Sequence, residues 1–244
     1  MGKLTDHVAI VTGGSRGIGR AVALAFAREG ARIAVTAAHD QAALEQTERE
    51  LASLGVETLG PLADVSRRVD IDSLVRAVIG KWQRIDILVN NAGVLKPSPL
   101  ENLSEEQWDE TLSVHLKGTF NCTQAVVPYM KQQGKGKIIN VAAPSALRGS
   151  YGVSDYAAAK GGIIAFTRNA ANELKPHNIQ VNCISPVADT RMTETLTNFR
   201  RHQLGQTERL RKFVSPDAIT PAFVFFASSD SDHVSGQLLE VGNV

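Results

Sequence analysis

The 244-residue sequence predicts an α/β fold: one doubly wound parallel sheet of about seven strands, flanked by helices, in a single domain over residues 1–244. The strand-like segments are apolar almost throughout, which is typical of strands that are buried on both faces. Helical segments alternate with them along the whole chain, and this alternation favours right-handed crossovers between parallel strands. No linker-like composition divides the chain, and 43% hydrophobic residues suffice for one large core.

Each expected element follows from a local pattern. The strand-like runs, in chain order, cover residues 7–13, 31–37, 57–64, 84–92, 136–143, 179–186 and 236–242. The helical stretches cover residues 18–29, 40–54, 67–83, 104–132, 155–175 and 216–229. Two of these helices begin with typical capping sequences, at Ser104 and at Ser215-Pro216.

Segment 187–214 breaks the alternation. Thr, Arg and Gln dominate it, so its helicity is ambiguous. Because it follows the sixth strand, we expect it to cover a substrate. Its arginines face either an anionic substrate or solvent; they are Arg191, Arg200, Arg201, Arg209 and Arg211.

Composition argues against several other classes of protein. The net charge is +1 and the basic residues are dispersed, so we expect neither a nucleic-acid nor a membrane partner. Cys122 and Cys183 lie in apolar segments, which indicates buried thiols in a reducing compartment rather than a disulfide. The first residues enter a strand pattern without the apolar region of a secretion signal, so we expect a cytoplasmic location.

A glycine-rich loop joins the first strand to the first helix. Glycines there allow a tight turn, bring the backbone close to a pyrophosphate and let the helix pack on the strand. The free N–H groups and partial positive charge of the helix N-terminus then favour the diphosphate. The sequence therefore predicts a Rossmann-type dinucleotide site, whose loop residues are Gly13, Ser15, Arg16, Gly17, Ile18 and Gly19.

The end of the second strand bears on the choice of cofactor. A site specific for NAD usually has Asp or Glu there to bind the ribose hydroxyls, but this chain has no carboxylate until Asp40. Arg16 and His39 are suited to neutralise a 2′-phosphate instead, although Arg16 is also compatible with a solvated surface position. NADP(H) is favoured, and NAD(H) remains open.

Four motifs in register resemble the short-chain dehydrogenase/reductase family over essentially the whole chain. They are Thr-Gly-Gly-Ser-Arg-Gly-Ile-Gly at 12–19, Asp64, Asn90-Asn91-Ala92-Gly93 and the Tyr156–Lys160 pair. The loop and second strand are most similar to the 3-oxoacyl-(acyl carrier protein) reductase type. The resemblance implies an NAD(P)(H)-dependent oxidoreductase that interconverts a ketone and a secondary alcohol. It does not identify the substrate.

The resemblance also implies roles for individual residues. Tyr156 is expected to be the general acid/base, and Lys160 to bind the nicotinamide ribose. Their i, i+4 spacing places both on one helix face, where the ammonium favours the phenolate. The other expected cofactor contacts are Asp64 and Val65 at the adenine, Asn91, Ala92 and Gly93 at the adenine ribose, and Pro186 and Thr190 near the nicotinamide.

The chain departs from the family pattern at three positions. Ala143 stands where the family has a catalytic serine, and Ser145, two residues on, is either its substitute or an ordinary loop hydroxyl. His115 stands where the family has an asparagine, and it either sustains the proton relay or is structural. Val187 replaces a glycine, and Asp189 either faces the substrate or caps a helix over 190–198.

These departures leave alternative functions open. One alternative is a cofactor-binding but catalytically impaired subunit beside an active relative, in a hetero-oligomer. Another is a lyase or isomerase on the same fold, for which no dedicated sequence feature argues. The family resemblance further implies a homotetramer or dimer, formed through the long helices at 104–132 and 155–175 and the last strand.

Overall fold

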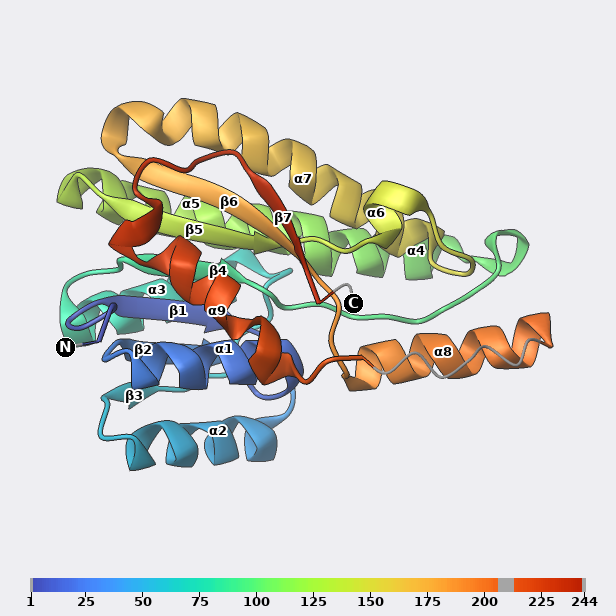
Figure 1. Ribbon diagram of the computed structural model, residues 1–244, viewed down its shortest axis with the longest axis horizontal. Coiled ribbons are helices and arrows are strands. Elements are labelled where there is room, and N and C mark those ends of the chain that lie inside the picture. Colours follow the sequence, from blue (N-terminus) through green and yellow to red (C-terminus); the bar gives the residue numbers. More distant parts are fainter. Residues whose placement is uncertain (1, 206–212, 243–244) are drawn as a thin grey trace.

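The computed structural model describes residues 2–205 and 213–242 and confirms the predicted fold (Figure 1). Seven parallel strands form one sheet in the order β3-β2-β1-β4-β5-β6-β7. Their bounds are β1 Val8–Thr12, β2 Arg32–Thr36, β3 Thr58–Leu59, β4 Ile87–Asn90, β5 Gly136–Val141, β6 Ile179–Pro186 and β7 Leu238–Val241. The strand order reverses between β1 and β4, and open α/β sheets bind ligands at the carboxyl ends of the strands around such a switch point.

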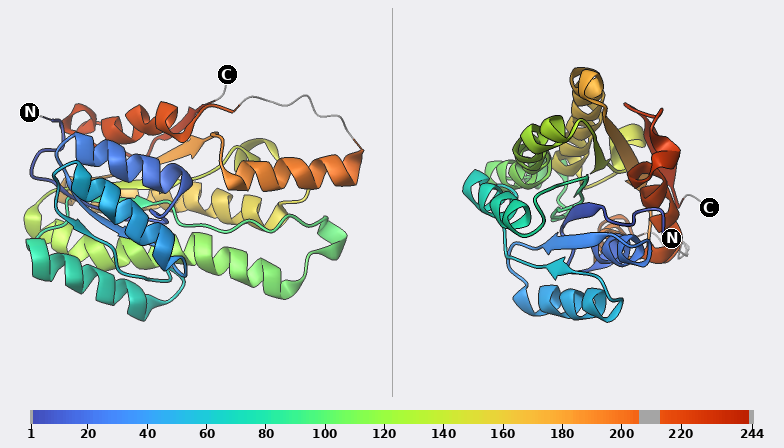
Figure 2. Two further views of the ribbon diagram at one scale, coloured as in Figure 1. Left: turned by 90° about the horizontal axis from the view of Figure 1, so that it is seen from below. Right: turned by 90° about the vertical axis from the view of Figure 1, so that its left-hand side faces the viewer.

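Helices cover both faces of the sheet (Figure 2). The α-helices are α1 Gly17–Arg28, α2 Gln41–Ser53, α3 Arg68–Trp82, α4 Glu105–Leu112, α5 Gly118–Gln133, α6 Ser145–Arg148, α7 Ser154–Leu174, α8 Arg191–Leu204 and α9 Pro216–Ala227. Single turns of 3-10 helix lie at η1 Leu100–Asn102, η3 Lys175–His177 and η4 Ser229–Ser231, and a π-helical turn, η2, covers Ser113–Lys117. One apolar core lies beneath α1, α2 and α9, and a second lies beneath α3, α5 and α7. Figure 1 shows α8 projecting beyond the sheet at the end of the molecule opposite the N-terminus.

The predicted elements are found with shorter bounds. The strand predicted over 57–64 is continuous only at Thr58 and Leu59, and pairing resumes in an isolated bridge between Leu62 and Ala37, because Pro61 lacks the N–H that would continue the ladder on this edge strand. The helix predicted over 104–132 is interrupted by the π-helical turn that contains His115. Ser104 caps α4 by accepting the Gln107 N–H, as predicted.

Segment 187–214 is helical over α8, where its sequence was ambiguous. The Thr190 side chain caps this helix by accepting the N–H of Thr193, and the Thr193 hydroxyl accepts the N–H of Thr190 in return. The alternative that Asp189 is the cap is therefore wrong, because the Thr190 hydroxyl already meets the Thr193 N–H. Arg209 and Arg211 lie outside the described residues.

Two further expectations concern the cysteines and the membrane. Cys122 and Cys183 are buried and free, as predicted. Within residues 2–205 and 213–242, no helix is both long enough and apolar enough to cross a bilayer. The cytoplasmic location stays a prediction.

Candidate active site

The glycine-rich loop is shaped by close contacts that leave no room for side chains. Gly13 and Gly17 have positive φ values of 64° and 54°. A Cβ on Gly13 would lie 2.9 Å from Cα of Ala92, and one on Gly19 would collide with the carbonyl of Gly13. Arg16, the N-cap residue of α1, makes no side-chain capping bond within the described part of the chain. The N-terminus of α1 therefore keeps the uncapped N–H groups that a diphosphate needs, so the loop fits a dinucleotide.

Asn91 ties the end of β4 to this loop. Its Nδ2 donates to the carbonyl of Thr12 at 2.9 Å and to that of Gly13 at 3.2 Å. The Thr12 hydroxyl accepts from the N–H groups of both Asn91 and Ala92 at 3.0 Å. These bonds fix the two strand ends that meet at the switch point.

The residues predicted to line the adenine, Asp64 and Val65, lie in the turn before α3. Asp64 accepts from the N–H of Ser66 at 2.9 Å and from its hydroxyl at 2.7 Å. Val65 is buried, and its carbonyl accepts from Nδ2 of Asn121 on α5 at 2.9 Å. The turn is therefore held rigidly at the carboxyl side of β3.

The residues predicted for a 2′-phosphate lie at the starts of two helices, Arg16 before α1 and His39 before α2. His39 is exposed, and Arg16 forms an ion pair with Asp40 rather than lying free in solvent. Asp40 also caps α2 by accepting the N–H of Ala43 at 3.1 Å. The predicted cationic group thus has an anionic neighbour that the sequence alone did not reveal.

Tyr156 and Lys160 lie side by side on α7, above the end of β5. The Lys160 ammonium lies 5.5 Å from the centre of the Tyr156 ring and donates to the carbonyl of Val141 at 2.6 Å. Burial lowers the pKa of Lys160 to about 8 and raises the pKa of Tyr156 above its ordinary value. At neutral pH the pair is therefore an ammonium beside a neutral phenol, with two ammonium protons left for a ligand.

His115 packs edge-on against Tyr156, with ring centres 5.0 Å apart and planes at 87°. Its Nε2 lies 2.7 Å from the carbonyl oxygen and 3.0 Å from the N–H of Val94. Burial, and then the charge of Lys160, lowers the pKa of His115 to about 3. The ring is therefore neutral. The shorter contact favours an Nε2–H that donates to Val94, which leaves Nδ1 as an acceptor, buried and without a partner among the described residues.

Gly93 makes the space that His115 fills, because a Cβ on Gly93 would collide with Cε1 of the imidazole. The histidine also lies in the π-helical turn, a feature that often marks functional sites. It thus borders the site and at the same time holds the backbone after β4 through Val94.

Where the family has a catalytic serine, this chain has an alanine. Ala143 is buried at the end of β5, and Ser145 is the first residue of α6. The Ser145 hydroxyl is buried and has no hydrogen-bond partner in the part of the chain that the structure describes. A buried hydroxyl without a partner costs stability, so one that is retained points to a ligand or water that would satisfy it.

The segment after β6 borders the phosphate loop. Pro186 ends β6, and a Cβ on Gly17 would lie 3.6 Å from Cγ2 of Thr190. Val187 donates its N–H to the carbonyl of Val241 at 2.9 Å, and its backbone lies outside the positive-φ region. Valine therefore replaces the family's glycine at this position without backbone strain.

Sequence reasoning missed the contacts that close the outer part of the site. The rings of Tyr151 and Phe199 stack with centres 6.1 Å apart, which joins α8 to the loop before α7. Ser98 donates its N–H to the carbonyl of Gly152 at 2.9 Å, and this brings a third segment to the same loop. No periodicity signals such contacts, because all three segments are irregular or polar.

A buried carboxylate next to Tyr156 was also missed. Asp155 accepts from the hydroxyl of Thr111 on α4 and from the N–H of Tyr156, both at 2.7 Å. It fixes the first turn of α7, which carries the tyrosine. A charged residue in the first turn of a helix is ordinarily solvated, so the sequence carried no signal for its burial.

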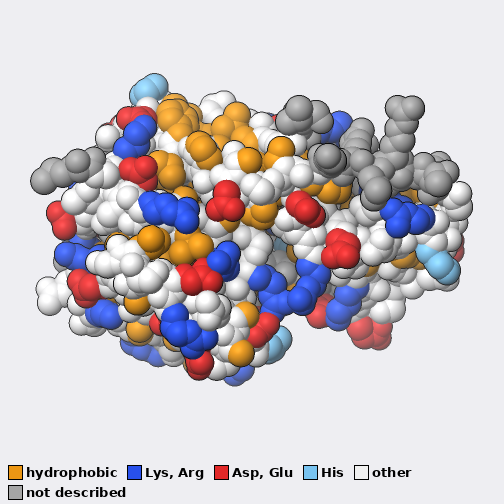
Figure 3. All heavy atoms as spheres, turned by 60° about the horizontal axis from the view of Figure 1, so that its bottom comes forward, with side chains coloured by type: hydrophobic (Ala, Val, Ile, Leu, Met, Phe, Trp, Pro, Cys, Tyr) orange, Lys and Arg blue, Asp and Glu red, His pale blue; other side chains and the backbone are white. Residues whose placement is uncertain are grey.

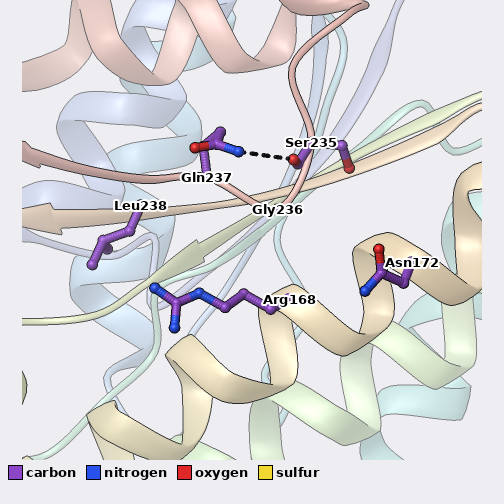
Figure 4. A pocket seen from close by; sticks show the side chains of 6 residues that line it. All are labelled: Arg168, Asn172, Ser235, Gly236, Gln237 and Leu238. Carbon is purple, nitrogen blue, oxygen red and sulfur yellow. Dashed lines mark hydrogen bonds between the residues drawn. The ribbon is translucent and has the colours of Figure 1, made fainter.

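The surface of the molecule has a hollow and a separate cavity. Figure 3 shows a hollow near the middle of the face that it presents, between the body of the molecule and the projecting end, with Lys and Arg side chains gathered along its edge. A separate cavity of about 610 Å³ lies between α7 and the segment leading to β7 (Figure 4). It is lined by Arg168, Asn172 and residues 235–238, none of which is an acid or base suited to proton transfer at a carbonyl.

Comparison with known proteins agrees with the geometry. The family profile described as short chain dehydrogenase matches residues 7–201. The chain belongs to the short-chain dehydrogenase family. This confirms the predicted family, whose members are oxidoreductases that act on CH–OH groups and use nicotinamide cofactors.

Individual relatives cover nearly the whole chain. A 3-oxoacyl-(acyl-carrier-protein) reductase of Thermotoga maritima is 37% identical, with 98% of this chain and 97% of that protein aligned. The BbsD subunit of a hydroxy(phenyl)methylsuccinyl-CoA dehydrogenase of Thauera aromatica is 38% identical, with 98% of this chain and 96% of that protein aligned. The crystal structure of levodione reductase superposes with a TM-score of 0.90 at 29% identity, over 98% of this chain and 97% of the other. These similarities do not favour the alternative of an impaired subunit in a hetero-oligomer.

Proposed function

We propose that this chain interconverts a ketone and a secondary alcohol with a nicotinamide cofactor, and that Tyr156 is the general acid/base. The observation that carries the proposal is the buried pair itself. A neutral phenol lies beside an ammonium that is anchored by Val141, above the carboxyl edge of the sheet at its switch point. Proton transfer to and from a carbonyl oxygen beside a bound dinucleotide is the chemistry that these two groups are suited to perform.

When bound, the nicotinamide ring supplies or accepts the hydride. In the direction of reduction, the Tyr156 hydroxyl donates a proton to the carbonyl oxygen as the carbon receives the hydride. In the direction of oxidation, the phenolate must form. Burial opposes the phenolate, because it raises the pKa of Tyr156, whereas the Lys160 ammonium beside it stabilises the anion. Lys160 also keeps two donors for the hydroxyls of the nicotinamide ribose.

We assign the second donor to the substrate oxygen to Ser145. Ala143 cannot donate, and losing one preorganised donor typically costs about 10²–10³ in rate. The Ser145 hydroxyl is buried without a partner among the described residues, so it is free to donate to a substrate. His115 acts beside Tyr156 as a neutral acceptor through Nδ1, where the family has an asparagine.

For the cofactor, NADP(H) is favoured over NAD(H). Support comes from Arg16 in the phosphate loop and from the end of β2, where Thr36, Ala37 and Ala38 provide no carboxylate for a ribose diol. The other residues assigned to the cofactor are Gly13, Ser15, Gly17, Ile18, Gly19, His39, Asp64, Val65, Asn91, Ala92, Gly93, Tyr156, Lys160, Pro186 and Thr190.

Segment 187–214 is proposed to cover the substrate. Its described part reaches from Thr190, next to Gly17, to Phe199, which stacks on Tyr151. It therefore spans from the phosphate loop to the loop that precedes Tyr156. A substrate bound between these two points lies beneath α8.

A homo-oligomer is proposed from two exposed apolar faces. On α4 and α5, Trp108 and Phe120 are 37% and 43% exposed, next to a shallow cavity lined largely by apolar side chains of α4, α5 and α7. On the other side of the sheet, Phe225 of α9 and Leu239 of β7 are 37% and 38% exposed. Light scattering at micromolar concentration is expected to show a dimer or tetramer, and a monomer would refute this part of the proposal.

Turnover tests the proposed activity. Cofactor absorbance is followed with a panel of ketones and alcohols for the wild type, Tyr156→Phe and the control Tyr129→Phe, which removes a phenolic hydroxyl from α5. We expect turnover with at least one substrate pair, a loss of about 10²–10⁴ in kcat for Tyr156→Phe and little change for Tyr129→Phe. An active wild type with an unaffected Tyr156→Phe variant contradicts the assigned role.

A further inference from the structure

The ion pair between Arg16 and Asp40 joins two helix N-termini at the place where a cofactor's 2′ group is expected. Arg16 is the N-cap residue of α1, with an extended backbone at φ −160° and ψ 175°. Its guanidinium binds the carboxylate of Asp40, which is the N-cap residue of α2. The two side chains are 45% and 40% exposed, so both are accessible to a ligand.

Asp40 holds its position independently of Arg16. One of its oxygens, Oδ1, accepts the Ala43 N–H at 3.1 Å, while the other, Oδ2, faces Arg16. Capping of α2 keeps the carboxylate in place, and asparagine caps helices about as well as aspartate. The negative charge can therefore be removed by Asp40→Asn with little disturbance of the helix.

A 2′-phosphate would need the same guanidinium. Near neutral pH it carries a charge between −1.5 and −2, and Arg binds such groups through its planar fork of donors. An exposed ion pair contributes only about 0–1 kcal/mol, so a phosphate can displace Asp40 from Arg16. The displaced carboxylate stays tethered at the N-terminus of α2, and it then repels the phosphate that replaced it.

We propose that Asp40 is a specificity-determining residue, which competes with the 2′-phosphate of NADP(H) for Arg16 and so reduces the preference for NADP(H) over NAD(H). The inference rests on the proposed function, because it concerns the cofactor site of that function. NAD(H) has no 2′-phosphate and leaves the Arg16–Asp40 pair intact.

The size of the effect follows from electrostatics. A unit charge and a phosphate dianion about 6 Å apart in water repel by about 1.4 kcal/mol, which corresponds to a tenfold change in Kd. Removing the charge of Asp40 is therefore expected to tighten the binding of NADP⁺ about tenfold. Binding of NAD⁺ should change less than about twofold, since no charge on its ribose faces Asp40.

A second ion pair between the same two helices supplies a matched control. Arg20 on α1 pairs with Glu50 on α2, ten residues beyond Asp40. Ten helical residues span about 15 Å, which exceeds the Debye length of about 8–10 Å at moderate salt. Glu50→Gln therefore changes the net charge as Asp40→Asn does, at a point about 15 Å along α2 from Asp40.

The experiment is equilibrium titration of the full-length chain with NADP⁺ and NAD⁺, by calorimetry or protein fluorescence and without substrate. Wild type, Asp40→Asn, Glu50→Gln and Asp40→Asn combined with Arg16→Ala are compared at 0.1 M salt. We expect about tenfold tighter NADP⁺ binding in Asp40→Asn only, and weaker NADP⁺ binding in the double variant than in Asp40→Asn, because the 2′-phosphate then loses its guanidinium. Thermal melting verifies that Asp40→Asn is folded.

Three results would overturn the inference. An unchanged NADP⁺ Kd in Asp40→Asn shows that the carboxylate does not compete. A gain that appears equally in Glu50→Gln shows a general charge effect. Weaker NAD⁺ binding in Asp40→Asn shows that Asp40 binds the ribose instead. In all three cases dinucleotides still bind and the proposed function stands, whereas a wild type that binds neither dinucleotide contradicts the proposed function itself.

Discussion

His115 is expected to make the fold sensitive to acid. Its pKa in the folded chain is about 3, because burial and the Lys160 charge disfavour the imidazolium. In the unfolded chain the pKa is about 6.5. Between these values the unfolded state binds more protons than the folded state, so the free energy of unfolding falls as the pH falls from about 6.5 towards 3.

The magnitude follows from this difference. Each pH unit well inside the window costs about 1.4 kcal/mol, and because the unfolded histidine is only half protonated at pH 6.5, the fall to pH 4.5 costs about 2 kcal/mol in total. Domains of this kind are stable by about 5–15 kcal/mol, so the loss is large enough to measure. The His115→Asn variant has no ionisable side chain at this position, so the contribution of His115 to the pH dependence of stability is absent.

Urea denaturation at pH 6.5 and pH 4.5 provides the assay, with the wild type, His115→Asn and the control His202→Asn on exposed α8. The loss of stability on acidification should be about 2 kcal/mol smaller in His115→Asn than in the wild type, whereas His202→Asn should behave like the wild type. Absolute stabilities are not compared, since the substitution also removes the contact with Val94. Equal losses in all three proteins would refute the reasoning that His115 is buried and neutral.

Three further outcomes are expected. Ser145→Ala should lower kcat about 10²-fold with a midpoint of urea unfolding at or above that of the wild type, because its buried hydroxyl has no partner among the described residues; an unchanged kcat contradicts its role as donor. Gly93→Ala should destabilise the fold by about 1–3 kcal/mol through collision with His115, and His115→Asn in the same chain should recover part of that loss; additive effects in urea titrations would contradict a direct clash. Phe199→Ala should raise KM more than it lowers kcat, because it removes the stack on Tyr151 that joins α8 to the loop before α7; equal KM values argue against a covering role for α8.

The sequence predicted the strands well where they are buried on both faces, because continuous apolar runs have few other uses in an α/β protein. β3 was overestimated, since apolar character alone does not reveal that an edge strand ends where Pro61 interrupts its ladder. α8 was ambiguous, since its stability comes from the Thr190–Thr193 cap and from contacts at one end rather than from an apolar stripe.

In the candidate site, too, some features could be predicted from the sequence and others could not. Tyr156 and Lys160 were predictable, because their spacing and their register with the phosphate loop are properties of the sequence. The pairing of Arg16 with Asp40 and the burial of Asp155 against Thr111 were not, because each joins two segments that only the folded chain brings together. Fitting His115 next to Gly93 likewise required the turn after β4 and the π-helical turn to be placed in space.

The central claim is that this site transfers hydride between a nicotinamide and a carbonyl carbon under the control of Tyr156. The most direct measurement follows a deuterium label from the C4 position of NADPH, and of NADH, into the alcohol formed from the best ketone of the substrate panel. Deuterium is expected on the carbinol carbon in the wild type, and the rate of deuterium transfer is expected to fall strongly in Tyr156→Phe. An alcohol product without the label, or equal transfer rates in the two proteins, would contradict the claim.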